Sequence, residues 1–246
     1  MIDFHSHILP GIDDGSRDPE MTRQMLASSR AQGVTVQLAT PHFYADRMRP
    51  AEFLARRAAA YARIREAAEQ ENVRILCGAE VAFFRNIGEA EALDALLIEN
   101  TDLLLLEMPF RAWNERDLAE LRRIRERGIT PVIAHAERFL GWRGNRDCLE
   151  TLAGAGAVMQ VNAGALLQWR TRRAALKLFR NGLAQLLASD CHNLSSRPQN
   201  LESGRSILEK KLGKETVAEV DRRGEALLGT KFPRENKELF TAYGQR

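Results

Sequence analysis

The 246-residue sequence predicts an α/β fold in which parallel strands form a distorted, TIM-like (β/α)7 barrel. Short apolar runs alternate with polar, alanine-rich helical patterns almost to the C-terminus, and this β-then-α order favours parallel strands. Some runs, such as Leu103–Leu106, are apolar at every position, which indicates strands buried on both faces. Polar residues typical of metal sites follow several of the runs, at the end where barrel enzymes carry their chemistry.

Seven runs are expected to form the strands, with ends defined to within a few residues. They are Ile2–His5, Thr35–Ala39, Val73–Gly78, Asp102–Leu106, Thr130–Ala134, Ala157–Val161 and Ala184–Ala188.

Helices are expected between these strands, at Pro19–Gln32, Ala51–Asn72, Gly88–Ile98, Glu115–Arg127, Arg146–Ala155 and Arg172–Asn181. Asp18 and Pro19 form a typical helix start, and Gly33, Gly128 and Gly182 are typical helix ends. Two further helical patterns, Gln199–Leu212 and Lys214–Leu228, precede a polar tail from Lys231 to Arg246. Because no linker-like segment divides the chain, residues 1–246 are expected to form a single domain.

Composition excludes several classes of protein. A formal charge of +3 is too small to indicate nucleic-acid binding, and no apolar run is long enough to cross a membrane. Three cysteines without zinc-ribbon spacing, and an N-terminus without a signal-peptide pattern, favour a reduced, cytoplasmic protein. The arginines of 122–125 and 170–173 are interpreted as solvated helix faces, although a basic rim that favours anionic substrates stays open.

The candidate site consists of all five histidines and several carboxylates, each at or beyond the end of an expected strand. A single histidine here would be read as a core hydrogen-bonding residue, but five in equivalent places predict a metal site. His5 and His7 are two residues apart, so their side chains share one face of a strand. The candidate ligands are His5, His7, His42, Glu80, Glu107, His135, Asp190 and His192.

The motifs that contain these residues resemble the polymerase-and-histidinol-phosphatase (PHP) superfamily. Within it, the sequence is most similar to the manganese-dependent protein-tyrosine phosphatases of bacterial capsule and exopolysaccharide operons. The resemblance runs in order from residue 2 to about residue 200. Its motifs are His5-x-His7, Pro10–Gly15, Thr40–His42, Gly78–Glu80, Leu106-Glu107, Ala134–Arg138 and Ser189–Asn193.

The resemblance implies a trinuclear metal site on a PHP-type barrel. One ion would take His5, His7, Glu80 and Asp190; a second would take Glu80, Glu107 and His135; the third would take Asp14, His42 and His192. Mn²⁺ is the implied metal, with Fe, Co²⁺, Zn²⁺ and Mg²⁺ as alternatives. Arg138 and Arg197 match arginines that hold the substrate phosphate. Ala136 replaces a common proline, and Cys191 replaces a smaller residue.

The implied reaction is hydrolysis of a phosphomonoester by a metal-bridging hydroxide that attacks phosphorus. Asp14 and Glu107 stand where histidinol-phosphatase relatives often have histidine, which favours phosphotyrosine on a protein, such as the tail of a bacterial tyrosine kinase that controls capsule synthesis. The alternative substrate is a small phosphate of the histidinol-phosphate or sugar-phosphate type. A non-enzymatic regulator is disfavoured by the complete ligand set, and a homo-oligomer is an open alternative.

Several residues near the site have competing interpretations. Cys191 and Arg197 have the C-x5-R spacing of cysteine-dependent phosphatases, but the intervening residues lack glycine, so the spacing is interpreted as a coincidence. Asp3 is expected either to orient an imidazole or to cap a turn, and Asp13 to be a turn residue. Eight aromatic residues follow the ligands and could either pack over the barrel mouth or form a rim for a phosphotyrosine ring: Phe43, Tyr44, Phe83, Phe84, Phe110, Trp113, Phe139 and Trp142.

Overall fold

The structure is a computed structural model that describes residues 1–229, so the expected polar tail lies outside the described residues. All seven expected strands are present with ends within one residue of the prediction. In chain order the described strands are β1 (Ile2–Ser6), β2 (Val36–Ala39), β3 (His42–Phe43), β4 (Arg74–Cys77), β5 (Glu80–Ala82), β6 (Leu103–Glu107), β7 (Thr130–Ile133), β8 (Val158–Asn162) and β9 (Ala184–Ala188). The short strands β3 and β5 were not expected.

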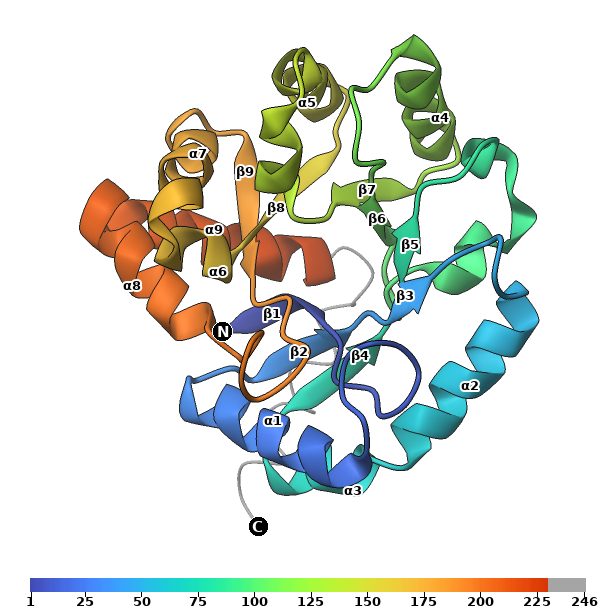
Figure 1. Ribbon diagram of the computed structural model, residues 1–246, viewed down its shortest axis with the longest axis vertical. Helices are drawn as coiled ribbons and strands as arrows, with labels where there is room; N and C mark the ends of the chain where they lie inside the picture. The colour runs from blue at the N-terminus through green and yellow to red at the C-terminus, as the bar shows by residue number, and fades with distance from the viewer. Residues whose placement is uncertain (230–246) are drawn as a thin grey trace.

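All strand pairs are parallel, and they form two sheets (Figure 1). The smaller sheet has the order β1-β2-β4, and the larger has the order β3-β5-β6-β7-β8-β9. Thr40-Pro41 separates β2 from β3, and Gly78-Ala79 separates β4 from β5, so two stretches of chain pass from one sheet to the other. Beyond β9, Cys191 pairs with Ser6 of β1 in an isolated bridge. The parallel α/β fold is therefore confirmed, while closure into one barrel stays a prediction.

Helices surround the strands, as Figure 1 shows. The α-helices are α1 (Pro19–Ala31), α2 (Pro50–Ala62), α3 (Arg65–Gln70), α4 (Glu115–Glu126), α5 (Asn145–Gly154), α6 (Ala163–Leu167), α7 (Trp169–Arg180), α8 (Leu201–Leu212) and α9 (Lys214–Gly229). The described residues also form 3₁₀ helices, namely η1 (Ile87–Glu89), η2 (Glu91–Leu96) and η3 (Ala136–Gly141). The expected helix start is confirmed, because the Asp18 side chain accepts a hydrogen bond from Met21 N. None of the described helices is long and apolar enough to cross a membrane.

Two expected helices are wrong in detail. The expected helix Ala51–Asn72 is broken between α2 and α3, where Ile64 turns fully into the core. The expected helix Gly88–Ile98 is instead η1 and η2. Its backbone is held by α4, since Gly88 N donates to Glu120 Oε2 (2.9 Å) and Arg127 donates to the carbonyl of Ala90 (2.8 Å). The Ala90 carbonyl is a group that a continuous α-helix would pair internally, whereas Gly88 N lies in the first turn, where a helix leaves N–H groups unpaired.

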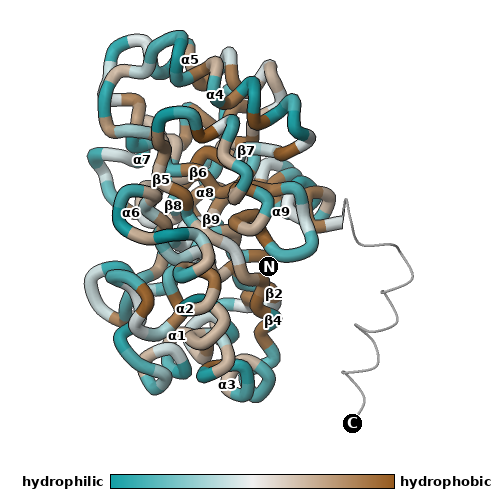
Figure 2. Tube along the Cα trace, turned by 90° about the vertical axis from the view of Figure 1, so that its right-hand side faces the viewer, coloured by the Kyte–Doolittle hydropathy of each residue, from teal (hydrophilic) through white to brown (hydrophobic). Residues whose placement is uncertain are grey.

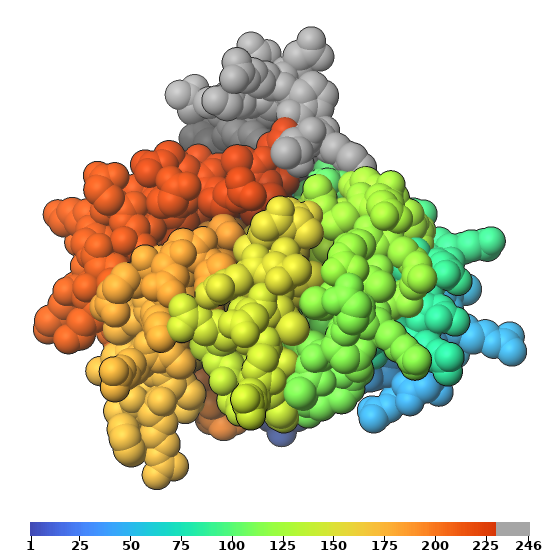
Figure 3. All heavy atoms as spheres, turned by 90° about the horizontal axis from the view of Figure 1, so that it is seen from above, coloured from blue at the N-terminus to red at the C-terminus, as the bar shows by residue number. Residues whose placement is uncertain are grey.

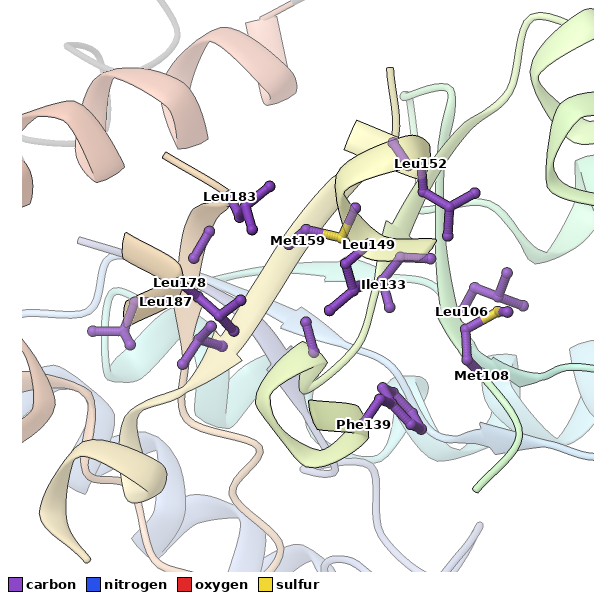
Figure 4. Packing of buried hydrophobic residues seen from close by; sticks show 14 of the residues in the cluster. Leu106, Met108, Ile133, Phe139, Leu149, Leu152, Met159, Leu178, Leu183 and Leu187 are labelled. Atoms are coloured by element: carbon purple, nitrogen blue, oxygen red, sulfur yellow. The ribbon is translucent and has the colours of Figure 1, made fainter. Parts of the chain in front are cut away.

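The core lies on both faces of the strands. Leu104 and Leu106 join one apolar cluster while Leu103 and Leu105 join another, which confirms the predicted burial of β6 on both sides. Figure 4 shows Leu106, Ile133, Met159 and Leu187 of successive strands packed with residues from the covering helices. Figure 2 shows the same distribution, with hydrophobic segments gathered inside and hydrophilic segments outside.

Asp3 connects the first strand to the end of the last. Its buried carboxylate accepts hydrogen bonds from Ser189 N (2.9 Å), Ser189 Oγ (2.6 Å) and Gln199 Nε2 (2.9 Å). Its carboxylate makes no hydrogen bond to an imidazole among the described residues, so of the two expected roles the orienting of a histidine is the one that the structure does not support. Burial raises the pKa of Asp3, while these hydrogen bonds oppose the shift.

Replacing Asp3 should therefore destabilise the fold. Asp3→Ala leaves Ser189 N without its acceptor and Gln199 Nε2 with Ser29 Oγ alone, at an expected cost of about 2–4 kcal/mol in the free energy of unfolding. Asp3→Asn keeps one acceptor oxygen and should lose less. Urea denaturation of the metal-free protein measures both variants, and an unfolding midpoint for Asp3→Ala equal to that of the parent would contradict this role.

Candidate active site

The nine candidate ligands converge at the carboxyl ends of the strands. They come from the two sheets and from the loops that follow them: His5 and His7 (β1 and its end), Asp14 (the loop before α1), His42 (β3), Glu80 (β5), Glu107 (β6), His135 (after β7), and Asp190 and His192 (after β9). Eight of them are buried or half-buried, and Asp14 is exposed. The grouping predicted from strand ends is therefore present in the fold.

The first group surrounds His5 and His7. Their Nε2 atoms lie 3.0 Å apart. Glu80 Oε2 is 3.2 Å from His5 Nε2 and 3.3 Å from His7 Nε2, and Asp190 Oδ1 is 3.4 and 3.5 Å from the same atoms. Four candidate ligands thus face one small volume.

The other two groups lie on either side. His135 Nε2 is 2.9 Å from Glu80 Oε1 and 3.3 Å from Glu107 Oε1. Asp14 Oδ1 is 3.4 Å from the Nε2 atoms of both His42 and His192.

The three groups share more residues than the expected assignment of ligands to three ions. The ligand atom of His7 is also grouped with those of Asp14, His42 and His192. The rings of His7 and His192 stack with their centroids 3.7 Å apart. His42 also lies with Glu80 and Glu107.

Unusual backbone conformations position several of these residues. His135 and Asp190 have φ angles of 34° and 54°, in the left-handed region that non-glycine residues seldom adopt and that is common at functional sites. Gly15 passes so close to His7 that an added Cβ would lie 2.1 Å from the His7 carbonyl oxygen. Only glycine fits there, which explains the end of the Pro10–Gly15 turn.

The charges of the cluster are strongly coupled. Burial disfavours ionised Glu80 and Asp190, but the adjacent imidazoles outweigh it and hold both pKa values well below their usual range. Burial also opposes protonation of His7 and His135, yet the carboxylates raise the pKa of His7 well above its usual value and that of His135 to about 9. His192 differs, because burial and the charge of His7 lower its pKa to about 4.

The donor set fits divalent metal ions. Within the described residues, Glu80 Oε2 and His192 Nε2 are buried polar atoms of the cluster with no hydrogen-bond partner. Buried polar atoms in proteins are nearly always hydrogen-bonded, so such orphans require an explanation such as an ion. Imidazole nitrogens mixed with carboxylate oxygens suit Mn²⁺, Fe²⁺, Co²⁺ and Zn²⁺.

Three residues that orient the ligands were missed or misread from the sequence. Asp13 Oδ2 lies 2.7 Å from His7 Nδ1, so Asp13 orients an imidazole in addition to shaping its turn. Gln160 Oε1 lies 3.1 Å from His5 Nδ1 and also accepts from His135 N. Asn162 Nδ2 donates to Asp190 Oδ2 (2.7 Å). Gln160 and Asn162 alternate with apolar residues in β8, as Asp3 and His5 do in β1, and this polar alternation could have identified them.

Arg138 and Arg197 flank the cluster. Nη2 of each donates to Asp190 Oδ2, at 2.8 and 2.9 Å, and both side chains are partly exposed. Two guanidinium groups therefore reach the same edge of the cluster from η3 and from the loop after β9. Guanidinium carries paired donors that match phosphate oxygens.

Cys191 faces away from the cluster. Its side chain is fully buried, Gln37 Nε2 lies 3.6 Å from its sulfur, and burial raises the pKa of its thiol. Its neighbours Asp190 and His192 face the cluster instead. The geometry therefore does not form a cysteine-nucleophile loop, as the absence of glycine indicated.

Cys191 should consequently be unreactive in the folded protein. Iodoacetamide at pH 8 is expected to modify the partly exposed Cys148 first and Cys191 only after unfolding, because alkylation requires an accessible thiolate. Peptide mass spectrometry measures both rates. Fast modification of Cys191 in folded protein, together with loss of activity in Cys191→Ser, would restore the cysteine mechanism.

The aromatic residues divide between packing and exposure. Phe43 and Trp113 are buried in the core, so their proposed contact with substrate is wrong. Phe110 is 51% exposed, and its ring stacks over that of His135 with centroids 6.1 Å apart. Tyr44 is half-buried with its ring 5.4 Å from that of His42. Phe110 and Tyr44 are therefore the aromatic residues best placed beside the ligands.

These features, a parallel α/β fold with histidines and carboxylates at its strand ends, define a metallohydrolase-like site. The chain belongs to the capsular polysaccharide synthesis CpsB/CapC family, whose model matches residues 1–226. The resemblance seen in the sequence motifs to capsule-operon phosphatases is thereby confirmed.

Individual relatives agree over almost the whole chain. The tyrosine-protein phosphatase YwqE of Bacillus subtilis is 30% identical over 93% of this chain and 91% of its own length. The tyrosine-protein phosphatase CpsB of Streptococcus pneumoniae is 30% identical over 89% of this chain and 94% of its own.

Solved structures are similar as well. One from a study of YwqE and CpsB, described as unique metal-dependent tyrosine phosphatases, has a TM-score of 0.83 at 29% identity and covers 94% of this chain and 95% of its own. An Escherichia coli phosphotriesterase homology protein, solved with phosphate in its active site, has a TM-score of 0.51 at 11% identity over 92% of this chain and 98% of its own, and shows a shared fold alone.

Proposed function

We propose that this chain is a metal-dependent protein-tyrosine phosphatase that acts on a phosphotyrosine protein of capsule or exopolysaccharide synthesis, such as a bacterial tyrosine kinase. The observation that carries the proposal is the meeting of nine candidate ligands and two arginines at one edge of the strands. Membership of a family whose relatives are named tyrosine-protein phosphatases supports the substrate class.

The proposed ligands form three overlapping groups around three divalent ions, with Mn²⁺ as the expected metal. The first group would be His5, His7, Glu80 and Asp190. The second would share Glu80 and add Glu107 and His135, and the third would be Asp14, His42 and His192. When bound, the ions would supply Lewis-acid activation of water and of the phosphoryl oxygens.

The chain's own residues bind and orient the substrate. Arg138 and Arg197 would bind the phosphate oxygens, because their partly exposed guanidinium groups already point at the carboxylate at the edge of the cluster. Asp13 and Gln160 fix the imidazoles of His7 and His5 through Nδ1, which leaves Nε2 of each facing the site. The leaving group of phosphotyrosine is a phenolate whose conjugate acid has a pKa of about 10, so its departure needs less help from a proton donor than that of an alkoxide.

Two finer expectations accompany this function. The two sheets are proposed to act as one distorted seven-stranded PHP-type barrel, in which β3 continues β2 and β5 continues β4. The Ser6–Cys191 bridge also joins the two sheets. A cytoplasmic location is expected from the three free cysteines.

Metal removal tests the proposal most directly. Treatment with EDTA should abolish hydrolysis of p-nitrophenyl phosphate, and Mn²⁺ should restore it, because the ligand cluster then regains its activating ions. Metal analysis by mass spectrometry should find up to three ions per chain in the active protein. Undiminished turnover by protein shown to be free of metal would refute the mechanism.

The arginines should act on phosphate and not on metal binding. Arg138→Ala or Arg197→Ala is expected to lower kcat/KM about 100-fold, as loss of a charged transition-state donor does, with unchanged metal content. Glu80→Ala is the matched contrast, since it should lose both metal and activity. Metal loss in the arginine variants would show that they support the ligands instead.

Phe110 should contribute to the choice of an aromatic substrate. Phe110→Ala is expected to raise KM for a phosphotyrosine peptide by about 2–10-fold, because one aromatic contact contributes about 0.5–1.5 kcal/mol. A small alkyl phosphate serves as the internal control and should be unaffected. Equal effects on both substrates would leave Phe110 only a packing role, and a parent preference for histidinol phosphate would favour the small-molecule alternative.

A further inference from the structure

Helix α7 carries an exposed row of positive charge. Its sequence from Trp169 to Arg180 contains five basic residues and no acidic one. Four of the basic residues are spaced three, four and three residues apart, so they lie along one face of the helix. All four are exposed, while the opposite face packs into the core. This basic row consists of Arg170, Arg173, Lys177 and Arg180.

The basic row has no carboxylate partner among the described residues. Other exposed arginines do, such as Arg23 with Glu20 and Arg222 with Glu219. The fifth basic residue of the helix, Arg172, is taken up by the carbonyls of Leu166 and Leu167 at the end of α6. Like charges at helical spacing repel one another, so the isolated protein gains nothing from such a row.

The row starts on the side of the strand ends, because α6 and then α7 follow directly on Asn162, the last residue of β8. Helix α7 packs against η3, the segment that carries Arg138. At this end Trp169 is 77% exposed with the Arg170 guanidinium 5.2 Å from its ring centre, and Leu167 is 37% exposed. Figure 3 shows this part of the chain, in gold, at the surface. From Arg170 to Arg180 the helix rises about 15 Å, which matches about four or five residues of an extended peptide.

We propose that the basic row and Trp169 form a docking surface for an acidic stretch of the polypeptide substrate, outside its phosphotyrosine. This inference rests on the proposed function, because it assumes that the substrate is a polypeptide held at the neighbouring site. Carboxylates of the substrate would pair with the row, and an apolar substrate residue would contact Trp169 and Leu167.

A membrane fits the same surface less well. Helices that bind at a membrane interface insert their apolar face into the lipid. In α7 that face, which includes Leu176 and Phe179, is buried inside the protein. Only the exposed Leu167 and Trp169 at one end of the row could enter a bilayer, whereas an acidic peptide needs only the charged face.

Charge reversal tests the proposal. The row variant carries Arg170→Glu, Arg173→Glu and Lys177→Glu. The control variant reverses three exposed cations on other elements, Arg63→Glu, Arg116→Glu and Lys214→Glu, with the same change in net charge. Two phosphotyrosine peptides differ only in having four glutamates or four glutamines beside the phosphotyrosine.

We expect the parent and the control variant to show a lower KM for the glutamate peptide. The row variant should raise that KM about tenfold, equivalent to about 1.4 kcal/mol, with kcat and the hydrolysis of p-nitrophenyl phosphate unchanged. Equal KM values for the two peptides in the parent, or equal losses in both variants, would overturn the proposal.

Binding without catalysis separates this inference from the proposed function. The unphosphorylated glutamate peptide should quench the fluorescence of Trp169, a change that Trp169→Phe removes and that the row variant weakens. If this binding occurs but no phosphotyrosine peptide is hydrolysed, the docking surface stands and the phosphatase assignment fails. If the parent instead binds phosphatidylglycerol vesicles through the row and ignores the peptide, the surface is a lipid site and the proposal is wrong.

Discussion

Glu80 is a buried carboxylate with imidazole nitrogens of four histidines within 3.3 Å of its oxygens. A buried charge costs several kcal/mol unless opposite charge surrounds it. The four imidazoles come from three parts of the chain, because His5 and His7 belong to the same stretch, so Glu80 can be both buried and ionised only when these parts are assembled together. The positions of Arg138 and Arg197 follow from the same constraint, since they neutralise the next carboxylate, Asp190.

The features that could be predicted are those that depend on a short stretch of sequence. The strands were found because their apolar runs are set by burial on both faces, and the ligands because each follows such a run. Strands β3 and β5 have two and three residues, too few to produce a run, and were missed. The break at Ile64 was also missed, because it depends on packing against residues distant in the chain.

Polar residues with distant partners were the least predictable. Asp3 lies two residues from His5, yet its partners Ser189 and Gln199 are at the other end of the chain. The sequence also shows the charges of α7 plainly, and they were interpreted as a solvated face. Only the fold reveals that they form no ion pair with a described carboxylate and that their helix packs against the segment that holds Arg138.

Because the strands form two sheets, the ligand cluster also connects two parts of the fold. His5 and His7 extend from the smaller sheet, whereas Glu80 and His135 belong to the larger sheet or follow it. An ion held between them would add a cross-link to the backbone hydrogen bonds that already join β1 to the chain after β9, from Asp190 N to His5 O and from His7 N to Cys191 O (both 2.9 Å). The two stretches that pass between the sheets, at Thr40-Pro41 and Gly78-Ala79, are themselves hydrogen-bonded to neighbouring chain, as Gly78 N is to Ala39 O (2.9 Å). Bound metal would therefore add rigidity between the two sheets as well as chemistry.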